Sequence, residues 1–277
     1  MRRRSFLAGF SLAAAAMVPA RLNAGPAARI EDAALAAMRS TKARGLALAL
    51  IEDGRPALVR AWGHRNANGD PLTIDTVMYG ASLTKAVFAY TVMQLVEERK
   101  LDLDRPVADY LPRPLPDYGN LDAYGNWGDL AGDERGEKLT PRILLTHSSG
   151  FSNFSWDEPD RKLRFNFDPG ARYAYSGEGL ILLQFALERG LGLDLGAEMQ
   201  RRVFDRFGMT NTGMMWRPDF ARNLADGWKE DGSVEPHDER GSVRAAGSMD
   251  TTIADFARFA AAFMRGDGLR PASRAEM

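Results

Sequence analysis

The sequence predicts an α/β protein of the α+β type, in which helices cover an antiparallel pair of strands. Two apolar runs, residues 46–51 and 57–62, flank Asp53-Gly54, a dipeptide typical of tight hairpin turns. The first run begins Leu-Ala-Leu-Ala-Leu and has no polar face, so we expect helices on both sides of the sheet. Residues 86–96 are apolar all round, which predicts a buried helix.

The composition describes an ordinary globular chain of one large domain or two interleaved ones. Its 277 residues are 45% hydrophobic and 26% charged, with a formal net charge of -1. This balance gives no support for nucleic acid or an anionic membrane surface as a partner. The absence of cysteine excludes disulfides and thiolate chemistry, and His64, His147 and His237 are isolated from one another. We therefore expect no metal site and no cofactor.

Residues 1–24 have the pattern of an export signal peptide. Three arginines at 2–4 precede an apolar run at 6–18, and small residues at 18–24 provide cleavage sites. The run is short for a bilayer, and Arg3-Arg4-Ser5-Phe6-Leu7 resembles a twin-arginine signal, which exports folded proteins. The alternative is an N-terminal anchor or a basic tail. We expect a periplasmic or secreted protein with no stable membrane span after processing.

The remaining elements follow in order. Residues 28–40 predict an amphipathic helix. Residues 113–138 lack a periodic pattern and are either a substrate rim or a surface loop packed by its own aromatic residues. Thr140-Pro141 starts a short helix, and residues 180–187 form an apolar one. A last helix is predicted at 252–264, because its first residues are spaced as a capping box.

The start of the buried 86–96 helix carries the candidate nucleophile. In Ser82-Leu83-Thr84-Lys85, the helical pitch places Lys85 one turn after Ser82 and on the same face. An ammonium in the first turn opposes the helix dipole and is costly to bury, whereas a neutral lysine could take the serine proton. Serine is also a preferred N-cap residue, so the tetrapeptide alone has a structural interpretation as well as a catalytic one.

Two further residues lie at breaks beside helix ends. Tyr175 precedes Ser176-Gly177 at the entry to the 180–187 helix, where a phenol either points into a cleft or belongs to the core. His147 suggests a catalytic triad, but a lone histidine at a helix end is more often a structural hydrogen-bonding residue, and we favour that interpretation. The sequence contains no complete phosphate-binding loop, dinucleotide fingerprint or nucleophile elbow.

Taken together, the motifs resemble the serine beta-lactamase and penicillin-binding-protein superfamily, and within it the branch of class C beta-lactamases and related esterases. They are Ser82-Leu83-Thr84-Lys85, the run from Leu144 to Gly150, Pro169-Gly170 followed by Tyr175-Ser176, and the segments 207–212 and 246–252. The resemblance implies an antiparallel sheet flanked by helices, a mostly helical domain, and an active site between them. We expect one domain over 25–277, with a sheet-side segment at 25–76, the helical part at 77–250 and a returning helix at 251–277.

The resemblance also implies roles for individual residues. Ser82 is the acylated nucleophile, and its backbone N–H forms half of the oxyanion hole. Lys85 is the activating base, and Tyr175 passes protons to the leaving group and later from water; which of the two acts first stays open. Ser176 and Gly177 are expected to contact the substrate, a small ester, amide or lactam, including cell-wall peptide.

Two departures from that pattern affect the predicted function. Gly177 replaces an asparagine whose amide holds the acyl amide of the substrate, so we expect esters to be preferred over lactams and Gly177→Asn to shift this preference. No Lys-Thr-Gly or His-x-Gly motif follows Met249, and residues 265–277 contain no alternating run. We therefore expect a chain that lacks the C-terminal strands, with an unpaired hairpin edge, and that is aggregation-prone or nearly inactive.

Two functions from different classes follow from these observations. The first, which we favour, is an exported serine hydrolase that acts through an acyl-enzyme on Ser82. The alternative is a non-catalytic binding protein, or an inactive truncated fragment of such a hydrolase.

Overall fold

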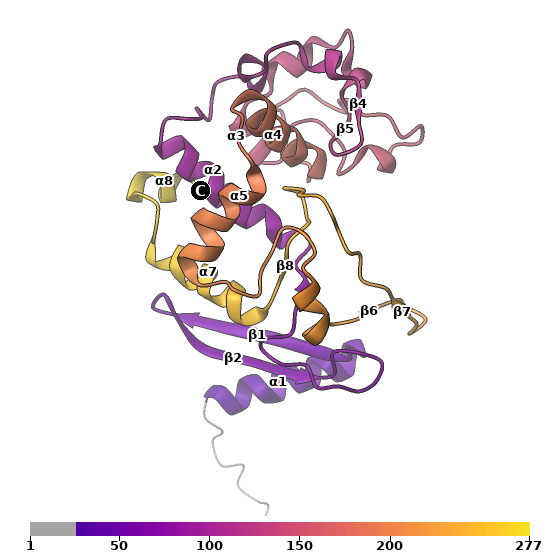
Figure 1. Cartoon of the computed structure of the whole chain (residues 1–277), viewed down its shortest axis with the longest axis vertical. Coiled ribbons are helices and arrows are strands. Elements are labelled where there is room, and N and C mark those ends of the chain that lie inside the picture. Colours follow the sequence, from indigo (N-terminus) through magenta and orange to yellow (C-terminus); the bar gives the residue numbers. More distant parts are fainter. Residues whose placement is uncertain (1–25) are drawn as a thin grey trace, which may run out of the picture.

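The computed structural model describes residues 26–277, and the predicted export signal at 1–24 lies outside these residues. Figure 1 shows the hairpin of β1 and β2 at one end of the molecule and a mostly helical part at the other. The predicted mixed α/β fold is therefore confirmed. No helix in the described part of the chain combines the length and the apolar character needed to cross a membrane.

The described part of the chain contains α-helices and strands of varied length. The α-helices are α1 (Pro26–Thr41), α2 (Leu83–Glu97), α3 (Pro141–Leu145), α4 (Gly177–Gly190), α5 (Leu195–Met199), α6 (Asp205–Phe207), α7 (Ile253–Arg265) and α8 (Pro271–Glu276). The strands are β1 (Gly45–Glu52), β2 (Arg55–Gly63), β3 (Met78–Tyr79), β4 (Asn120–Leu121), β5 (Gly125–Asn126), β6 (Gly227–Trp228), β7 (Val234–Glu235) and β8 (Asp250–Thr251). Several 3-10 turns and a π-helical turn at Gln200–Phe204 connect them.

The hairpin forms as the sequence predicts. β1 and β2 pair antiparallel from Gly45 opposite Gly63 to Glu52 opposite Arg55. The turn residues Asp53 and Gly54 have φ angles of +48° and +69°, the left-handed backbone that a tight hairpin turn requires. α7 packs across both strands and α1 lies on the opposite side of the hairpin (Figure 1). Helices on both faces explain why β1 has no polar face.

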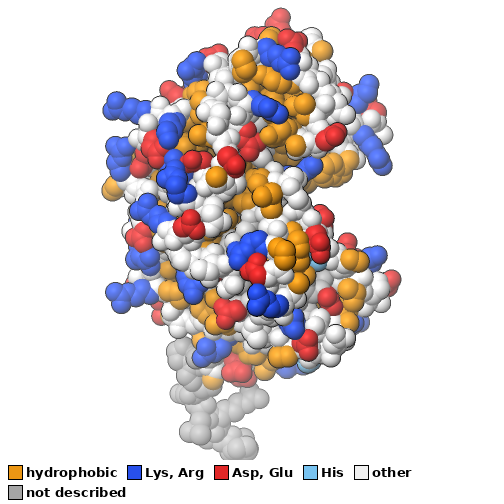
Figure 2. Space-filling model, in the orientation of Figure 1, with side chains coloured by type: hydrophobic (Ala, Val, Ile, Leu, Met, Phe, Trp, Pro, Cys, Tyr) orange, Lys and Arg blue, Asp and Glu red, His pale blue; other side chains and the backbone are white. Residues whose placement is uncertain are grey.

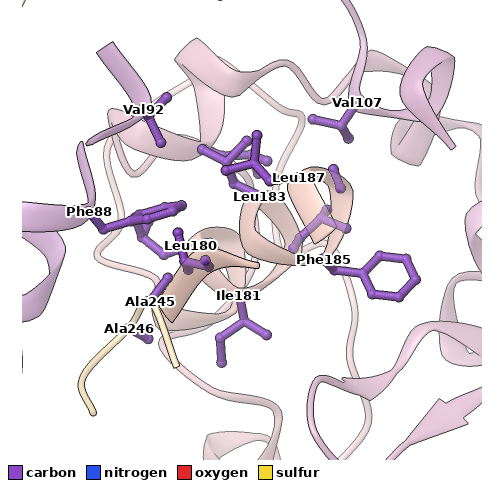
Figure 3. Packing of buried hydrophobic residues seen from close by; sticks show 14 of the residues in the cluster. Phe88, Val92, Val107, Leu180, Ile181, Leu183, Phe185, Leu187, Ala245 and Ala246 are labelled. Atoms are coloured by element: carbon purple, nitrogen blue, oxygen red, sulfur yellow. The ribbon is translucent and has the colours of Figure 1, made fainter. Parts of the chain in front are cut away.

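α2 and α4 form the centre of the helical part. Figure 3 shows Leu180 and Leu183 of α4 packed toward Phe88 and Val92 of α2, and all four side chains are buried. Burying each such side chain contributes about 1.5–3 kcal/mol relative to leaving it exposed. This packing fixes the N-terminal ends of both helices, where the candidate site residues lie.

The segment 113–138 packs on itself and on α4. It contains three 3-10 turns and the β4–β5 pair. The rings of Tyr118, Tyr124 and Trp127 surround Phe185 at centroid distances of 4.9, 5.1 and 5.6 Å, and Trp127 is fully buried. Of the two interpretations of this segment, packing by its own aromatic residues is the one that the structure supports.

α7 begins at the predicted cap. The Thr252 hydroxyl oxygen accepts a hydrogen bond from the Asp255 N–H at 3.1 Å. The Asp255 carboxylate does not return that bond; it accepts from the Asn211 N–H at 2.7 Å and from the Thr212 hydroxyl at 3.0 Å. Asp255 therefore ties α7 to the chain that follows α6. Within residues 26–277 no strand follows α7, and α8 is helical, in keeping with the missing alternating run.

Candidate active site

A short strand pairing brings two distant segments together at the N-terminus of α2. β3 pairs antiparallel with β8, with Tyr79 opposite Asp250. The Gly80 N–H donates to the Met249 carbonyl at 2.8 Å, and the Met249 N–H donates to the Thr84 hydroxyl at 3.1 Å. The chain around Met249 is thereby fixed beside the first turn of α2.

Ser82 is the residue immediately before α2 and lines a cavity. Its side chain makes no capping hydrogen bond to the helix. The hydroxyl therefore does not serve as the N-cap that the structural interpretation of the tetrapeptide would require. Ala81 before it has a φ of +44°, a strained conformation for a residue with a Cβ. Such strain persists only where the surroundings impose it, and here it sets the turn from β3 into the nucleophile position.

Lys85 approaches Ser82 from within the protein. Its Nζ donates to the Ser82 hydroxyl oxygen at 3.0 Å and to the Ala246 carbonyl at 2.6 Å, and the side chain is only 8% exposed. The Ala246 carbonyl holds the amine in line with the serine. Sequence reasoning did not find Ala246, because a backbone acceptor leaves no side-chain signal and the contact depends on the β3–β8 pairing.

Tyr175 completes the cluster from the entry to α4. The Lys85 Nζ lies 4.9 Å from the centroid of the Tyr175 ring, which is 39% exposed. Burial raises the pKa of the Tyr175 phenol, but hydrogen bonding with Lys85 and Ser82 and the charge of Lys85 outweigh it and lower this pKa below its ordinary value of 10.0. A phenol of this kind can pass protons between a lysine and a serine. The structure thus brings the three predicted catalytic side chains together.

The predicted oxyanion donor is also available. Within the described residues the backbone N–H of Ser82 donates no hydrogen bond. It lies at the N-terminus of the fifteen-residue helix α2, where the helix dipole favours negative charge. This N–H can therefore stabilise an oxyanion on a carbonyl that Ser82 attacks.

The cavity next to Ser82 has a volume of about 540 Å³. Its walls come from the end of β3 and the turn into α2, the aromatic pair Phe154 and Trp156, Ile181 of α4, and most of the segment 238–248. In Figure 2 the right-hand outline of the molecule is indented between the helical part and the part that carries the sheet, with apolar side chains exposed above and below the indentation. The cavity is large enough for a small-molecule substrate.

Arg240 belongs to the far wall of this cavity. Its guanidinium lies 4.0 Å from the centroid of the Tyr79 ring and donates to the buried Asp250 carboxylate at 2.5 Å. His237 faces the second oxygen of Asp250, with its Nε2 3.4 Å away. Burial raises the pKa of Asp250, while Arg240 and His237 oppose that rise. Because Asp250 offsets its charge, Arg240 fixes the wall rather than presenting a free cation.

Ser176 and Gly177, predicted to contact the substrate, are buried at the start of α4 and do not line the cavity. The Ser176 hydroxyl accepts from the Gly179 N–H at 3.1 Å and donates to the Ser152 carbonyl at 2.9 Å, so it caps the helix. A Cβ on Gly177 would lie 2.5 Å from the Phe154 ring. An asparagine at position 177 would therefore have to displace the ring, and the shift of preference toward lactams in Gly177→Asn stays a prediction.

His147 has the structural role that the sequence favoured. Its Nδ1 accepts a hydrogen bond from the Ser176 N–H at 3.1 Å, and its ring packs on the Tyr175 ring at a centroid distance of 4.6 Å. Burial lowers the pKa of His147, and the charge of Lys85 lowers it further, although the Ser176 backbone opposes this. A neutral imidazole therefore supports the phenol of Tyr175 and does not itself reach the serine.

Comparison with known proteins identifies the family of this chain. Residues 28–277 match the family model Beta-lactamase. Lovastatin esterase of Penicillium rubens is 29% identical over 179 residues, which is 56% of this chain and 44% of that protein. Monacolin J acid methylbutanoyltransferase of Aspergillus terreus is 29% identical over 240 residues, 76% of this chain and 57% of that protein. The chain spans about half the length of these curated relatives.

The fold recurs among solved structures. The octameric penicillin-binding protein homologue from Pyrococcus abyssi superposes with a TM-score of 0.71 at 22% identity, covering 91% of this chain and 60% of that one. This likeness concerns the fold, whereas the family model covers nearly all of the described sequence. The predicted resemblance to the serine beta-lactamase and penicillin-binding-protein superfamily is confirmed, and this chain belongs to the beta-lactamase family.

Proposed function

We propose that this protein is an exported serine hydrolase that forms an acyl-enzyme on Ser82 and prefers esters. The observation that carries the proposal is the 3.0 Å approach of the Lys85 Nζ to the Ser82 hydroxyl in a buried setting. A buried amine beside a hydroxyl that caps no helix has a clear chemical use, since the Lys85–Tyr175 pair can accept the serine proton. The family membership supports the same reaction class.

The reaction follows from the positions of these groups. Ser82 transfers its proton to the Lys85–Tyr175 pair as its oxygen attacks the substrate carbonyl carbon. The oxyanion that forms is stabilised by the Ser82 N–H. Tyr175 returns the proton to the leaving oxygen as the ester bond breaks, which leaves an acyl group on Ser82. Water then attacks the acyl carbon and gives one proton to the same pair. The pair returns that proton to the Ser82 oxygen as the acyl–oxygen bond breaks, which releases the acid and the free serine.

The preference for esters rests on the space around Gly177. Gly177 has no side chain, so position 177 offers no amide to a substrate. The Phe154 ring fills the volume into which a side chain at this position would extend. A lactam or amide substrate whose acyl amide required such a contact would lose about 1 kcal/mol or more for each missing hydrogen bond. The relatives named as an esterase and as a methylbutanoyltransferase support chemistry at carboxylic esters.

The proposal also covers the export of the protein and the range of its substrates. The pattern of residues 1–24 supports transport to the periplasm or the exterior. A cavity of about 540 Å³ suits a small ester, amide or lactam, including a fragment of cell-wall peptide. The alternative, a binding protein or an inactive fragment that keeps the cavity without turnover, makes the opposite prediction for covalent labelling.

Covalent labelling separates the two functions. The purified chain is incubated with a fluorescent fluorophosphonate and, in parallel, with a fluorescent penicillin, and the site of modification is located by mass spectrometry of peptides. We expect a fluorophosphonate adduct on Ser82 and a slower penicillin adduct or none. Ser82→Ala is the matched control and should remove all labelling. A folded chain that neither probe modifies would support the binding protein or inactive fragment instead.

A further inference from the structure

A stacked aromatic pair stands in the wall of the cavity, and no step of the proposed reaction uses it. The rings of Phe154 and Trp156 lie 4.1 Å apart between centroids and are inclined by only 16°. Both residues line the same cavity as Ser82, and Trp156 is 55% exposed. So large an apolar side chain at the rim of a catalytic cavity, rather than in the core, is typical of a binding surface.

The loop that carries the pair is fixed to the N-terminus of α4. The Glu178 N–H donates to the Asn153 carbonyl at 2.9 Å, and the Ser155 N–H donates to the Glu178 carboxylate at 2.7 Å. The Gly177 N–H donates to the Asn153 side-chain oxygen at 3.0 Å. Because the loop is held on the helix that follows Tyr175, the aromatic surface is already in position relative to the proton-transferring phenol. Such preorganisation lowers the entropic cost of binding.

Gly177 is the residue that admits the Phe154 ring. A Cβ at this position would lie 2.5 and 2.7 Å from two atoms of the ring edge, Cε1 and Cζ, closer than real Cβ contacts. The φ angle of Gly177 is not in the left-handed region, so the backbone does not require glycine here. The glycine is explained by the space that the ring needs.

The reaction geometry indicates which part of the substrate meets the pair. The leaving group must lie toward Tyr175, because that phenol returns its proton. Tyr175 does not line the cavity, whereas Phe154 and Trp156 do. The cavity is therefore left for the acyl part of the substrate. The two stacked rings form a flat apolar surface, so they suit a flat apolar group.

We infer that Phe154 and Trp156 form an acyl-binding subsite that selects esters with an aromatic acyl group, and that Gly177 makes this subsite possible. This inference rests on the proposed function, since it takes Ser82 as the acylated residue. It assigns specificity to three residues that take no part in the proton transfers.

The first test compares 4-nitrophenyl esters that differ only in the acyl group. We expect wild-type protein to cleave the phenylacetate with a higher kcat/KM than the acetate or the hexanoate. Trp156→Ala and Phe154→Leu should lower kcat/KM for phenylacetate about tenfold, since aromatic stacking and apolar burial are lost, and should lower kcat/KM for the acetate by a much smaller factor. Trp228→Ala is the matched control, because Trp228 packs against Arg44 and does not line the cavity. Equal losses on all three esters would overturn the inference.

The second test examines the fit between Gly177 and Phe154. Gly177→Ala alone should displace the ring, lower the melting temperature and remove the phenylacetate preference. Adding Phe154→Ala relieves the overlap, so the double variant should be at least as stable as Phe154→Ala alone. Additive losses of stability would show that the ring does not depend on the glycine, and would contradict the assignment of position 177.

The two proposals fail in distinguishable ways. If wild-type protein cleaves the acetate but shows no aromatic preference, the subsite is wrong and the hydrolase stands. If no ester is cleaved, the hydrolase proposal fails, and the subsite is judged by binding to the Ser82→Ala variant. Binding of 4-nitrophenyl phenylacetate to the Ser82→Ala variant should quench its tryptophan fluorescence. Adding Trp156→Ala to that variant should remove the quenching. An undiminished response in the double variant would overturn the subsite.

Discussion

At the residue scale, one proton path accounts for the side chains around the nucleophile. Ser82 provides the hydroxyl, Lys85 is held to it by the Ala246 carbonyl, and Tyr175 lies over the amine with a lowered pKa. The His147 ring packs against the tyrosine ring. Each group has a neighbour that fixes its orientation, which is what proton transfer at a defined distance requires.

Replacing Ser82 by alanine should remove activity without weakening the fold. The hydroxyl is the attacking group, so we expect hydrolysis of activated esters to fall by at least about 1000-fold. Because this hydroxyl makes no capping bond, the free energy of unfolding should change by less than the ~1 kcal/mol typical of a lost cap. Ester turnover and urea unfolding measure the two quantities. Undiminished turnover would remove Ser82 from the nucleophile position.

Lys85 and Tyr175 should behave as one proton-transfer unit. Lys85→Ala and Tyr175→Phe are each expected to abolish most turnover, and the double variant should be little worse than either single one, because losses within such a unit do not add. Single-turnover acylation by an activated ester measures all three. If the two losses multiplied, the residues would act independently.

The lowered pKa of Tyr175 predicts a pH dependence. The phenolate is populated at a lower pH than that of an ordinary tyrosine, so kcat/KM should rise along a limb centred below pH 10.0. Lys85→Met removes the charge and hydrogen bond that lower this pKa, while burial still raises it, so the titration should move to higher pH. Ultraviolet absorbance of the phenolate, with Tyr175→Phe subtracted, follows the group directly. An unmoved titration would contradict the coupling between the two residues.

At the element scale, the two helices that carry the site are fixed by different means. Most of α2 is buried, with Leu83 and Ala86 of its first turns exposed, and its far end is held to the π-helical turn at 200–204 by an ion pair. The guanidinium of Arg202 donates to both oxygens of Glu98 at 2.5 and 2.8 Å and also to Glu198. This pairing is bidentate and Arg202 is buried, which is the geometry in which such a pair has a measurable effect.

The Glu98–Arg202 pair predicts acid sensitivity. The hydrogen bond from Arg202 lowers the pKa of Glu98 from 4.5 to about 2, against the opposing effect of burial. The stability that this carboxylate contributes is therefore full above pH 4.5 and is lost as the pH falls through 2. Urea unfolding of wild-type protein and Glu98→Gln between pH 7 and 2 tests this. The difference between the two proteins should shrink with falling pH, and a constant difference would refute the assignment.

At the scale of the whole molecule, the link between the helical part and the sheet depends on a few polar contacts. α7 lies on the hairpin, and its Asp255 is fully buried while it accepts bonds from Asn211 and Thr212. Burial raises the pKa of Asp255, although these two donors and Arg258 oppose the rise. The Thr212 hydroxyl also lies 2.8 Å from that of Thr251 in β8. The strand that positions the site is thus tied to the helix that covers the sheet.

Removing the Asp255 carboxylate should loosen this link. Asp255→Ala removes the acceptor of the Asn211 N–H and of the buried Thr212 hydroxyl, so we expect the free energy of unfolding to fall by about 2 kcal/mol or more. Asp255→Asn keeps one acceptor oxygen and should cost less. Urea unfolding measures both variants, and fluorophosphonate labelling tells whether the site near β8 is affected. Equal stability of Asp255→Ala and wild-type protein would show that the link is unimportant.

The sequence by itself determined the features that depend on residues close together along the chain. The hairpin at Asp53-Gly54, the buried helix α2 and the Ser82–Lys85 face all follow from local periodicity and turn chemistry, which act over a few residues. Only the tertiary structure decided that Ala246 orients Lys85 and that the Phe154 ring fills the space beside Gly177. These contacts depend on the β3–β8 pairing and on a loop fixed to α4, and they join segments whose local patterns carry no information about each other. Packing in three dimensions, rather than sequence periodicity, sets the shape of the substrate cavity.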